Sequence, residues 1–134
     1  MRAAMIYGVS LVVVGNRANR KPIGHSTDTY KGHRHIPTIV TDDVMDMVPY
    51  DCVPIAVDLL EDATPLPEFE HPERAFYVFG AEGATLGKRV VSSCAHSVFI
   101  PSPTGRCSNL AVAVNIVLYD RFIKRTSLGI THLD

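Results

Sequence analysis

Short apolar runs that alternate with segments of helical character limit the fold of this chain more than any other feature. The runs are nearly continuous and rich in β-branched and aromatic residues, as buried parallel strands are; they cover 10–15, 53–57, 75–80 and 96–100. Segments typical of helices lie at 41–48, 84–95 and 108–125. This alternation predicts an α/β fold, with a mostly parallel sheet and helices on both of its faces. A chain of 134 residues has the length of one domain, so we expect a single domain over 1–134.

The segment 108–125 is the longest expected helix. Its first two thirds are apolar nearly all round, and its end carries Lys124 and Arg125. A helix of that composition is expected to be buried, with its cations at the negative end of the helix dipole. Ser108 or Asn109 is suited to an ordinary N-cap, an interpretation that stands beside any functional role.

Three loops follow predicted strands and are rich in Gly, Pro, Ser or acidic residues: 58–73, 81–88 and 101–109. Ligands of parallel α/β sheets bind at the carboxyl ends of the strands. These loops are therefore the candidate pocket.

The loop "FGAEGATLGK" has the glycines of a phosphate-binding turn but not its pattern. A P-loop requires G-x-x-x-x-G-K-[ST], with four residues between its glycines, whereas only three residues separate Gly83 from Gly87, and Arg89 follows Lys88. Glu82 adds a carboxylate that would repel phosphate. We therefore expect a backbone cradle for a neutral or cationic ligand, which disfavours a small-molecule nucleotide-binding enzyme.

The cysteines and histidines give weaker signals. The chain has three cysteines, Cys52, Cys94 and Cys107. An odd number of cysteines fits no disulfide framework and favours reduced thiols in the cytoplasm. No spacing matches a structural zinc site, so no metal is expected. A nucleophilic Cys94 or Cys107 stays open, although such cysteines are more often core residues. No apolar run is long enough to span a bilayer.

The charge is unevenly distributed, although the net charge is only −1. Ten of the fourteen acidic residues lie between Asp42 and Glu73. A basic segment precedes them, with candidate RNA-binding residues Arg17, Arg20, Lys21, Lys31 and Arg34. Such a segment is suited to phosphate contacts with a polyanion, and a solvated surface loop is an equally good interpretation of it.

The stretch "YVFGAEGATLGKRVVSSCAHSVFIPSPTGRCSNLAVAVNIVLYDRF" resembles the C-terminal half of the SPOUT RNA methyltransferases, in their SpoU (TrmH-like) branch. The second motif of that family is an apolar strand, then G-x-E-G, then a helix, which corresponds here to 79–83. The third motif is "IP", a short loop and S-x-N-L at the start of a long helix that ends in Tyr-Asp or Tyr-Glu. It corresponds to Ile100 and Pro101, then 107–110, then Tyr119 and Asp120.

Upstream, "RAAMIYGVSLVVVGNR" resembles the end of the first motif, N-x-G-x-x-x-R-x-A, with Arg2 at its arginine. The resemblance therefore covers nearly the whole chain. It implies a C-terminal trefoil knot, a homodimer, and S-adenosyl-L-methionine bound by the loops of the knot. The cofactor pocket that it implies is formed by Gly80, Glu82, Gly83, Ile100 and Leu110.

The resemblance also implies the reaction, methyl transfer to a ribose 2′-hydroxyl of RNA (tRNA or rRNA). The catalytic residues that it implies are Arg2, Asn109 and Glu82. We expect Arg2 to stabilise the developing alkoxide rather than to act as a base, because a guanidinium does not give up its proton. Asn109 is expected to position the nucleophile. Glu82 either lies near the positive sulfonium of the cofactor or orients catalytic groups.

Two departures from the family pattern leave an alternative function open. Cys107 stands where the family has serine, and the first-motif strand and asparagine that should precede Arg2 are absent. The domain is thus expected to lack its first strand, either as a fragment or by nature. The alternative function is a non-catalytic SPOUT-like dimer that binds RNA or the cofactor.

Overall fold

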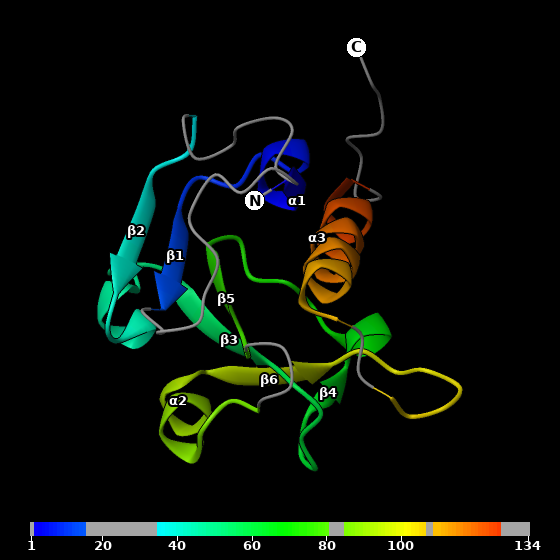
Figure 1. Cartoon of the computed structure of the whole chain (residues 1–134). Coiled ribbons are helices and arrows are strands. Elements are labelled where there is room, and N and C mark those ends of the chain that lie inside the picture. The colour runs from blue at the N-terminus through cyan, green and yellow to red at the C-terminus, as the bar shows by residue number, and fades with distance from the viewer. Residues whose placement is uncertain (1, 16–34, 81–84, 107–108, 127–134) are drawn as a thin grey trace. The chain divides into compact units, whose positions relative to one another are not determined.

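The structure is a computed structural model that describes residues 2–15, 35–80, 85–106 and 109–126. The chain forms two compact units, Met1–Met47 and Val48–Asp134, and each is described by itself. Figure 1 shows the elements of both units.

The N-terminal unit contains one parallel pair of strands. It consists of α1 (Arg2–Ile6), β1 (Val12–Gly15), β2 (Thr38–Thr41) and a short 3-10 helix, η2 (Val44–Met47). β1 and β2 pair in parallel, with Val12 opposite Thr38. The helix expected over 41–48 is only a single 3-10 turn, η2. Two features limit its length: the side chain of Asp43 accepts the N–H of Met45 through Oδ1 (3.0 Å), and Pro49 follows shortly after the turn. The sequence did not predict α1 or β2.

The C-terminal unit contains a four-stranded sheet in the order β4-β6-β3-β5, and every pairing in it is parallel. Its strands are β3 (Val53–Val57), β4 (Thr64–Pro65), β5 (Ala75–Phe79) and β6 (His96–Phe99). Its helices are η3 (Leu66–Glu68, 3-10), α2 (Lys88–Ser93) and α3 (Leu110–Thr126). β4 was not predicted from the sequence, and it lies at the sheet edge, where its proline is tolerated. The predicted α/β class with parallel strands is confirmed.

The core of this unit lies on the central strand β3. Ile55, Ala56 and Val57 are consecutive and all buried, so both faces of the strand are covered, as in other parallel sheets. α2 packs near β3. One buried cluster joins the sheet to η3 and α3; it consists of Ile55, Val57, Leu66, Phe69, Val98 and Val117.

α3 differs from the expectation of a buried helix. Only Val117 and Leu118 are buried in it, whereas a run of apolar side chains faces outward. The exposed ones are Leu110, Val112, Tyr119, Phe122 and Ile123. One side of the helix packs on the core and the opposite side has no cover within the described part of the chain. The sequence shows how apolar the helix is but not which side is covered.

The trefoil knot stays a prediction. The resemblance implies that the loops 81–88 and 101–109 belong to the knot. Residues 81–84 and 107–108 of these loops lie outside the described residues.

Candidate functional site

The carboxyl ends of three neighbouring strands define the candidate site. β3 lies between β6 and β5, with Val57 opposite both Phe79 and Val98. Asp58, Gly80 and Ile100 directly follow β3, β5 and β6, so the three loops begin at one edge of the sheet. This is the edge at which parallel α/β sheets bind ligands. The three loops predicted from the sequence to form the pocket therefore begin at the same edge of the sheet.

Asp58 holds two of these loops together. Its Oδ1 accepts the N–H of Leu59 (2.8 Å) and its Oδ2 accepts the N–H of Leu86 (2.9 Å), which is 28 residues away in sequence. Its own N–H donates to the carbonyl of Val98 on β6 (3.0 Å). Asp58 thus connects the end of β3 with β6 and with the end of the glycine-rich loop. Sequence reasoning placed the residue in a pocket loop but assigned it no role.

The third loop contains a tight turn before α3. Gly105 has φ +71°, a left-handed conformation that favours glycine, and its N–H donates to the carbonyl of Ser102 (3.1 Å). The Ser102 hydroxyl donates to the carbonyl of Arg106 (3.1 Å). This turn returns the chain toward the start of α3.

Asn109 is the N-cap of α3. Its Oδ1 accepts the N–H of Val112 (2.8 Å), and its carbonyl accepts the N–H of Ala113 (2.9 Å). The N-cap interpretation is therefore confirmed. The amide nitrogen of the side chain donates no hydrogen bond among the described residues, so the capping role leaves this donor available for a second function.

The other predicted cofactor residues are only partly described. Gly80 and Ile100 are half-buried at the shared edge, and Ile100 packs against the core cluster. Leu110, the first residue of α3, is 38% exposed. Glu82 and Gly83 lie outside the described residues.

The remaining predicted residues lie in the N-terminal unit or outside the described residues. Arg2 is exposed on α1 in the N-terminal unit, and its proximity to Asn109 stays a prediction. The candidate RNA-binding residues lie outside the described part of the chain; they are Arg17, Arg20, Lys21, Lys31 and Arg34.

The chemistry of Cys94 argues against a nucleophilic role. The side chain is half-buried at the end of α2, and burial raises the pKa of its thiol above 9.0. The nucleophilic form of cysteine is the thiolate, which this environment disfavours. Among the described residues, no group of three or more His, Cys, Asp or Glu side chains is arranged to hold a metal ion. Within the same residues, no helix has the length and hydrophobicity needed to cross a membrane.

The sequence model of the SpoU rRNA Methylase family matches residues 1–119, and the chain belongs to this family. No match was found among curated proteins.

Three solved structures have a similar fold. The TrmH/SpoU tRNA-modifying enzyme of A. aeolicus is 18% identical at a TM-score of 0.79, with 96% of this chain and 68% of that one covered. The SpoU methyltransferase AviRb of Streptomyces viridochromogenes, in complex with AdoMet, is 21% identical at a TM-score of 0.77, and the match covers 94% of this chain and 51% of that one. An RNA 2′-O ribose methyltransferase is 19% identical at a TM-score of 0.72, and the match covers 92% of this chain and 49% of that one. The chain thus spans about half the length of the last two.

Proposed function

We propose that this protein is an S-adenosyl-L-methionine-dependent methyltransferase that acts on a ribose 2′-hydroxyl of RNA in the cytoplasm. One observation carries the proposal: the two loops that resemble the family's second and third motifs begin at the carboxyl ends of β5 and β6, on either side of β3. AdoMet is bound in the solved structure of AviRb, and a 2′-O ribose methyltransferase has the same fold. These relatives support the cofactor and the reaction.

The residues present suit this cofactor. Adenosine is a largely apolar group that needs close backbone contacts, and Gly80 and the half-buried Ile100 lie where such contacts form. The sulfonium is positive, and Asp58, which directly follows β3, contributes a carboxylate at this edge of the sheet. Glu82, in the second motif, adds another carboxylate. We expect Gly80, Glu82, Gly83, Ile100 and Leu110 to hold the cofactor, which supplies an activated methyl group when bound.

The chain's own catalytic work concerns the 2′-hydroxyl. This oxygen is a poor nucleophile until negative charge on it is stabilised. The amide nitrogen of Asn109 is a donor held in place by the N-cap, and it is suited to positioning that oxygen. Arg2 is proposed to stabilise the developing alkoxide and hold the adjacent phosphate, and Glu82 to orient these groups.

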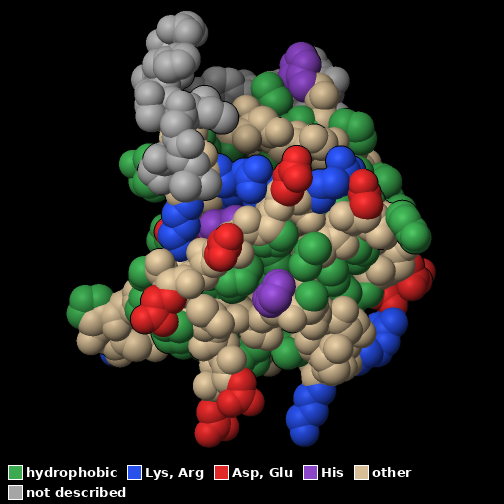
Figure 2. All heavy atoms as spheres, turned by 180° about the vertical axis from the view of Figure 1, so that it is seen from behind, with side chains coloured by type: hydrophobic (Ala, Val, Ile, Leu, Met, Phe, Trp, Pro, Cys, Tyr) green, Lys and Arg blue, Asp and Glu red, His purple; other side chains and the backbone are tan. Residues whose placement is uncertain are grey.

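The RNA surface is proposed to include the basic segment with Arg17, Arg20, Lys21, Lys31 and Arg34. Figure 2 shows one face of the protein, on which Lys and Arg side chains are interrupted by Asp and Glu. That face offers no continuous basic surface among the described residues.

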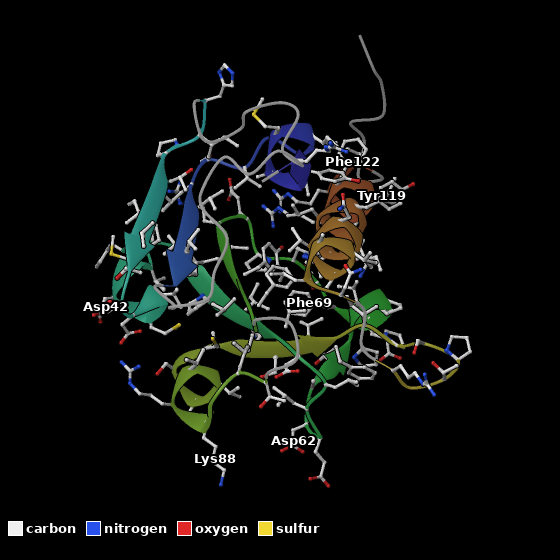
Figure 3. The ribbon with its side chains drawn as sticks, in the orientation of Figure 1. Asp42, Asp62, Phe69, Lys88, Tyr119 and Phe122 are labelled. Carbon is white, nitrogen blue, oxygen red and sulfur yellow. The ribbon has the colours of Figure 1, made fainter. Side chains whose placement is uncertain are left out.

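A homodimer through α3 is part of the same proposal. Ala111, Val112, Asn115, Tyr119, Phe122 and Ile123 are all exposed and recur at helical spacing, so they share one face of α3. Figure 3 shows Tyr119 and Phe122 on the part of α3 that points away from Phe69 in the core. An exposed helix face is normally charged, whereas this face has no charged residue. A second copy of the same face is a suitable cover for it.

The function is tested by incubating the protein and labelled S-adenosylmethionine with unmodified tRNA and rRNA transcripts. We expect label in RNA, at a nucleotide whose 3′ linkage then resists alkaline cleavage, since that cleavage needs a free 2′-hydroxyl. Label at an alkali-sensitive site would indicate base methylation. Cofactor binding without transfer to any RNA would support the non-catalytic dimer.

The bridge made by Asp58 leads to a prediction about cofactor affinity. In Asp58→Ala, the N–H of Leu86 loses its acceptor and the glycine-rich loop loses its connection to β3, so S-adenosylmethionine should bind about tenfold more weakly. Asp58→Asn keeps one oxygen, which can accept the N–H of Leu86 or of Leu59 but not both, so its affinity should lie between those of the parent and Asp58→Ala. Calorimetric titration of the two variants checks this. Equal affinities in Asp58→Ala and the parent protein would show that the bridge does not shape the pocket.

A further inference from the structure

Among the described residues, His71 is the only polar residue that is buried, and the proposed chemistry does not use it. It lies between η3 and β5 in the C-terminal unit, with its side chain only 1% exposed. Its Nδ1 is 2.6 Å from the Tyr77 hydroxyl on β5, and its Nε2 is 2.7 Å from Asp120 Oδ2 on α3. The rings of Phe69 and Tyr77 pack edge-on against it.

These contacts specify the protonation state of His71. The carboxylate of Asp120 only accepts, so the Nε2–H of His71 donates to it. Arg121 Nη1 donates to the Tyr77 hydroxyl oxygen (3.2 Å), which leaves the Tyr77 O–H to donate to Nδ1. Every donor then has an acceptor when the imidazole is neutral. A proton on Nδ1 would face the Tyr77 oxygen, which would then receive two donors and lose the acceptor of its own hydrogen.

The electrostatic surroundings agree with this assignment. Burial lowers the pKa of His71 below 6.5, and this effect exceeds the opposing influence of the Asp120 carboxylate. Lys124 and Arg121 on α3 lower the pKa further. Burial also raises the pKa of Tyr77 above 10.0, although Arg121 opposes this shift. The pair is therefore neutral at physiological pH.

The same cluster attaches the C-terminal half of α3 to segment 66–73. Lys124 Nζ donates to the carbonyls of Leu66 (2.6 Å) and Phe69 (2.8 Å) and pairs with Asp120 (2.8 Å). Arg121 donates to the carbonyls of Pro72 and Glu73, both at 2.6 Å. Asp120, Arg121 and Lys124 share the side of α3 opposite its exposed apolar face. α3 is thus attached to the segment before β5 along this one side.

The attachment lies far from the residues that α3 contributes to the candidate site. At about 1.5 Å of rise per residue, about 16 Å of helix separates Asp120 from Asn109. A tilt of a few degrees at the anchor would move the start of the helix by about 1 Å, and such a misplacement can cost about 100-fold in rate.

We propose that His71 is a positioning residue for methyl transfer: with Tyr77 and Asp120 it fixes α3 so that Asn109 and Leu110 keep their places at the site. This inference rests on the proposed function. His71 is not itself a catalytic residue, because substrate cannot reach a side chain that is 1% exposed.

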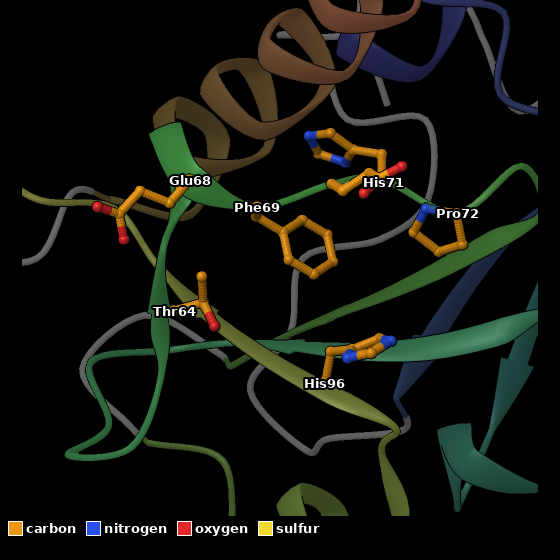
Figure 4. A pocket seen from close by; sticks show the side chains of 7 residues that line it. Thr64, Glu68, Phe69, His71, Pro72 and His96 are labelled. Atoms are coloured by element: carbon orange, nitrogen blue, oxygen red, sulfur yellow. The ribbon is translucent and has the colours of Figure 1, made fainter.

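The groove beside His71 does not offer a better explanation. It measures about 440 Å³ and is lined by Thr64, Glu68, Phe69, Glu70, His71, Pro72 and His96. Figure 4 shows this groove, with Phe69 between Thr64, His71 and His96. Both ring nitrogens of His71 are already bonded within the protein. The carboxylates of Glu68 and Glu70 would repel the phosphates of RNA, so we propose no ligand for this groove.

Two variants of His71 test the inference. His71→Leu removes both hydrogen bonds and should lower kcat by about 10- to 100-fold in a protein that still folds. His71→Gln carries one amide donor and one acceptor at nearly the spacing of the two ring nitrogens, so it should recover most of the rate. If His71→Leu does not fold, Tyr77→Phe removes only the hydroxyl and takes its place. A folded His71→Leu or Tyr77→Phe with the parent's kcat would overturn the proposal, as would a folded His71→Gln with no recovery.

The pH dependence of stability and of kcat distinguishes the proposed hydrogen-bonding role of His71 from a role that only fills space. The folded pKa of His71 lies below its unfolded value of 6.5, so the unfolded chain takes up the proton first as the pH falls. The stabilisation by His71 is complete above pH 6.5 and is lost as the pH falls from there through the folded pKa. Relative to His71→Gln, which does not titrate, the parent should lose melting temperature below pH 6.5 and should lose kcat only as the pH falls through the lower folded pKa of His71. Parallel profiles for the two proteins would contradict the inference.

Two measurements on the parent protein separate this inference from the proposed function. Nitrogen-15 NMR of the His71 ring should show the Nε2–H tautomer, whatever the protein binds. A ring that is Nδ1–H, or that titrates at 6.5, would refute the anchor alone. Absence of S-adenosylmethionine binding by the parent would refute the proposed function, with the NMR and stability results still deciding whether the anchor exists.

Discussion

The variant Asn109→Ser should lose methyl transfer by about 100- to 1,000-fold, the usual effect of removing one positioned donor from an active site. Serine keeps an oxygen that can accept the N–H of Val112, so α3 should keep its N-cap and the protein its stability. Only the amide donor is lost. S-adenosylmethionine affinity should stay within about threefold of the parent, since Asn109 is proposed to act on the 2′-hydroxyl. Single-turnover transfer and calorimetry measure the two quantities.

Asn109→Ala is the matched control for the capping role. It removes the amide donor and the cap oxygen together, so its rate should equal that of Asn109→Ser while it unfolds about 1 kcal/mol more easily. If serine restores both stability and rate, Asn109 serves only as the N-cap, and another group must position the nucleophile.

The second large effect is expected at the apolar face of α3. Phe122 is 44% exposed in one chain, and no side-chain hydrogen bond is lost when it is replaced. In Phe122→Glu, each protomer of a dimer formed through this face would bury an unpaired carboxylate. We expect a loss of about 3 kcal/mol or more in dimer stability, which is at least about 100-fold in the dissociation constant. Sedimentation at micromolar concentration should show the parent as a dimer and the variant as a folded monomer.

Tyr50→Glu is the control for this experiment. Tyr50 is fully exposed and lies outside α3, in the turn before β3, so its substitution should leave the dimer unchanged. A parent protein that sediments as a monomer would contradict the dimer, and a Phe122→Glu variant that stays dimeric would place the interface elsewhere.

The strands and pocket loops could be predicted because their signals are local. Each of the runs at 53–57, 75–80 and 96–100 is apolar and β-branched enough to fill the interior of a parallel sheet, and each became a strand. Once strands alternate with helices, parallel pairing follows, and the loops after neighbouring strands meet at one edge. The N-cap at Asn109 likewise follows from the chemistry of one side chain.

The contacts that hold the site together could not be predicted because their partners are distant in sequence. Leu86 is 28 residues from Asp58, and Asp120 is 49 residues from His71. No periodicity or motif links such pairs; only the packing of β3, β5 and α3 brings them within hydrogen-bonding distance. β4 was missed for a related reason, because Thr64 and Pro65 form a strand only where β6 offers them a partner.

The exposed side of α3 shows a third limit of sequence reasoning. Apolar composition indicates that a surface will be covered but not what covers it. The sequence therefore predicted a helix buried in its own domain, whereas the structure covers one side and leaves the other to a second copy in our proposal.

Calorimetric titration of the protein with S-adenosylmethionine, and with its demethylated product, tests the central claim most directly. It depends on the two best-matched loops and not on the identity of the RNA. The account predicts micromolar binding of both compounds, with a stoichiometry of one site per chain or one per dimer. A folded protein that binds neither compound would contradict the proposed methyltransferase activity and leave only the family fold.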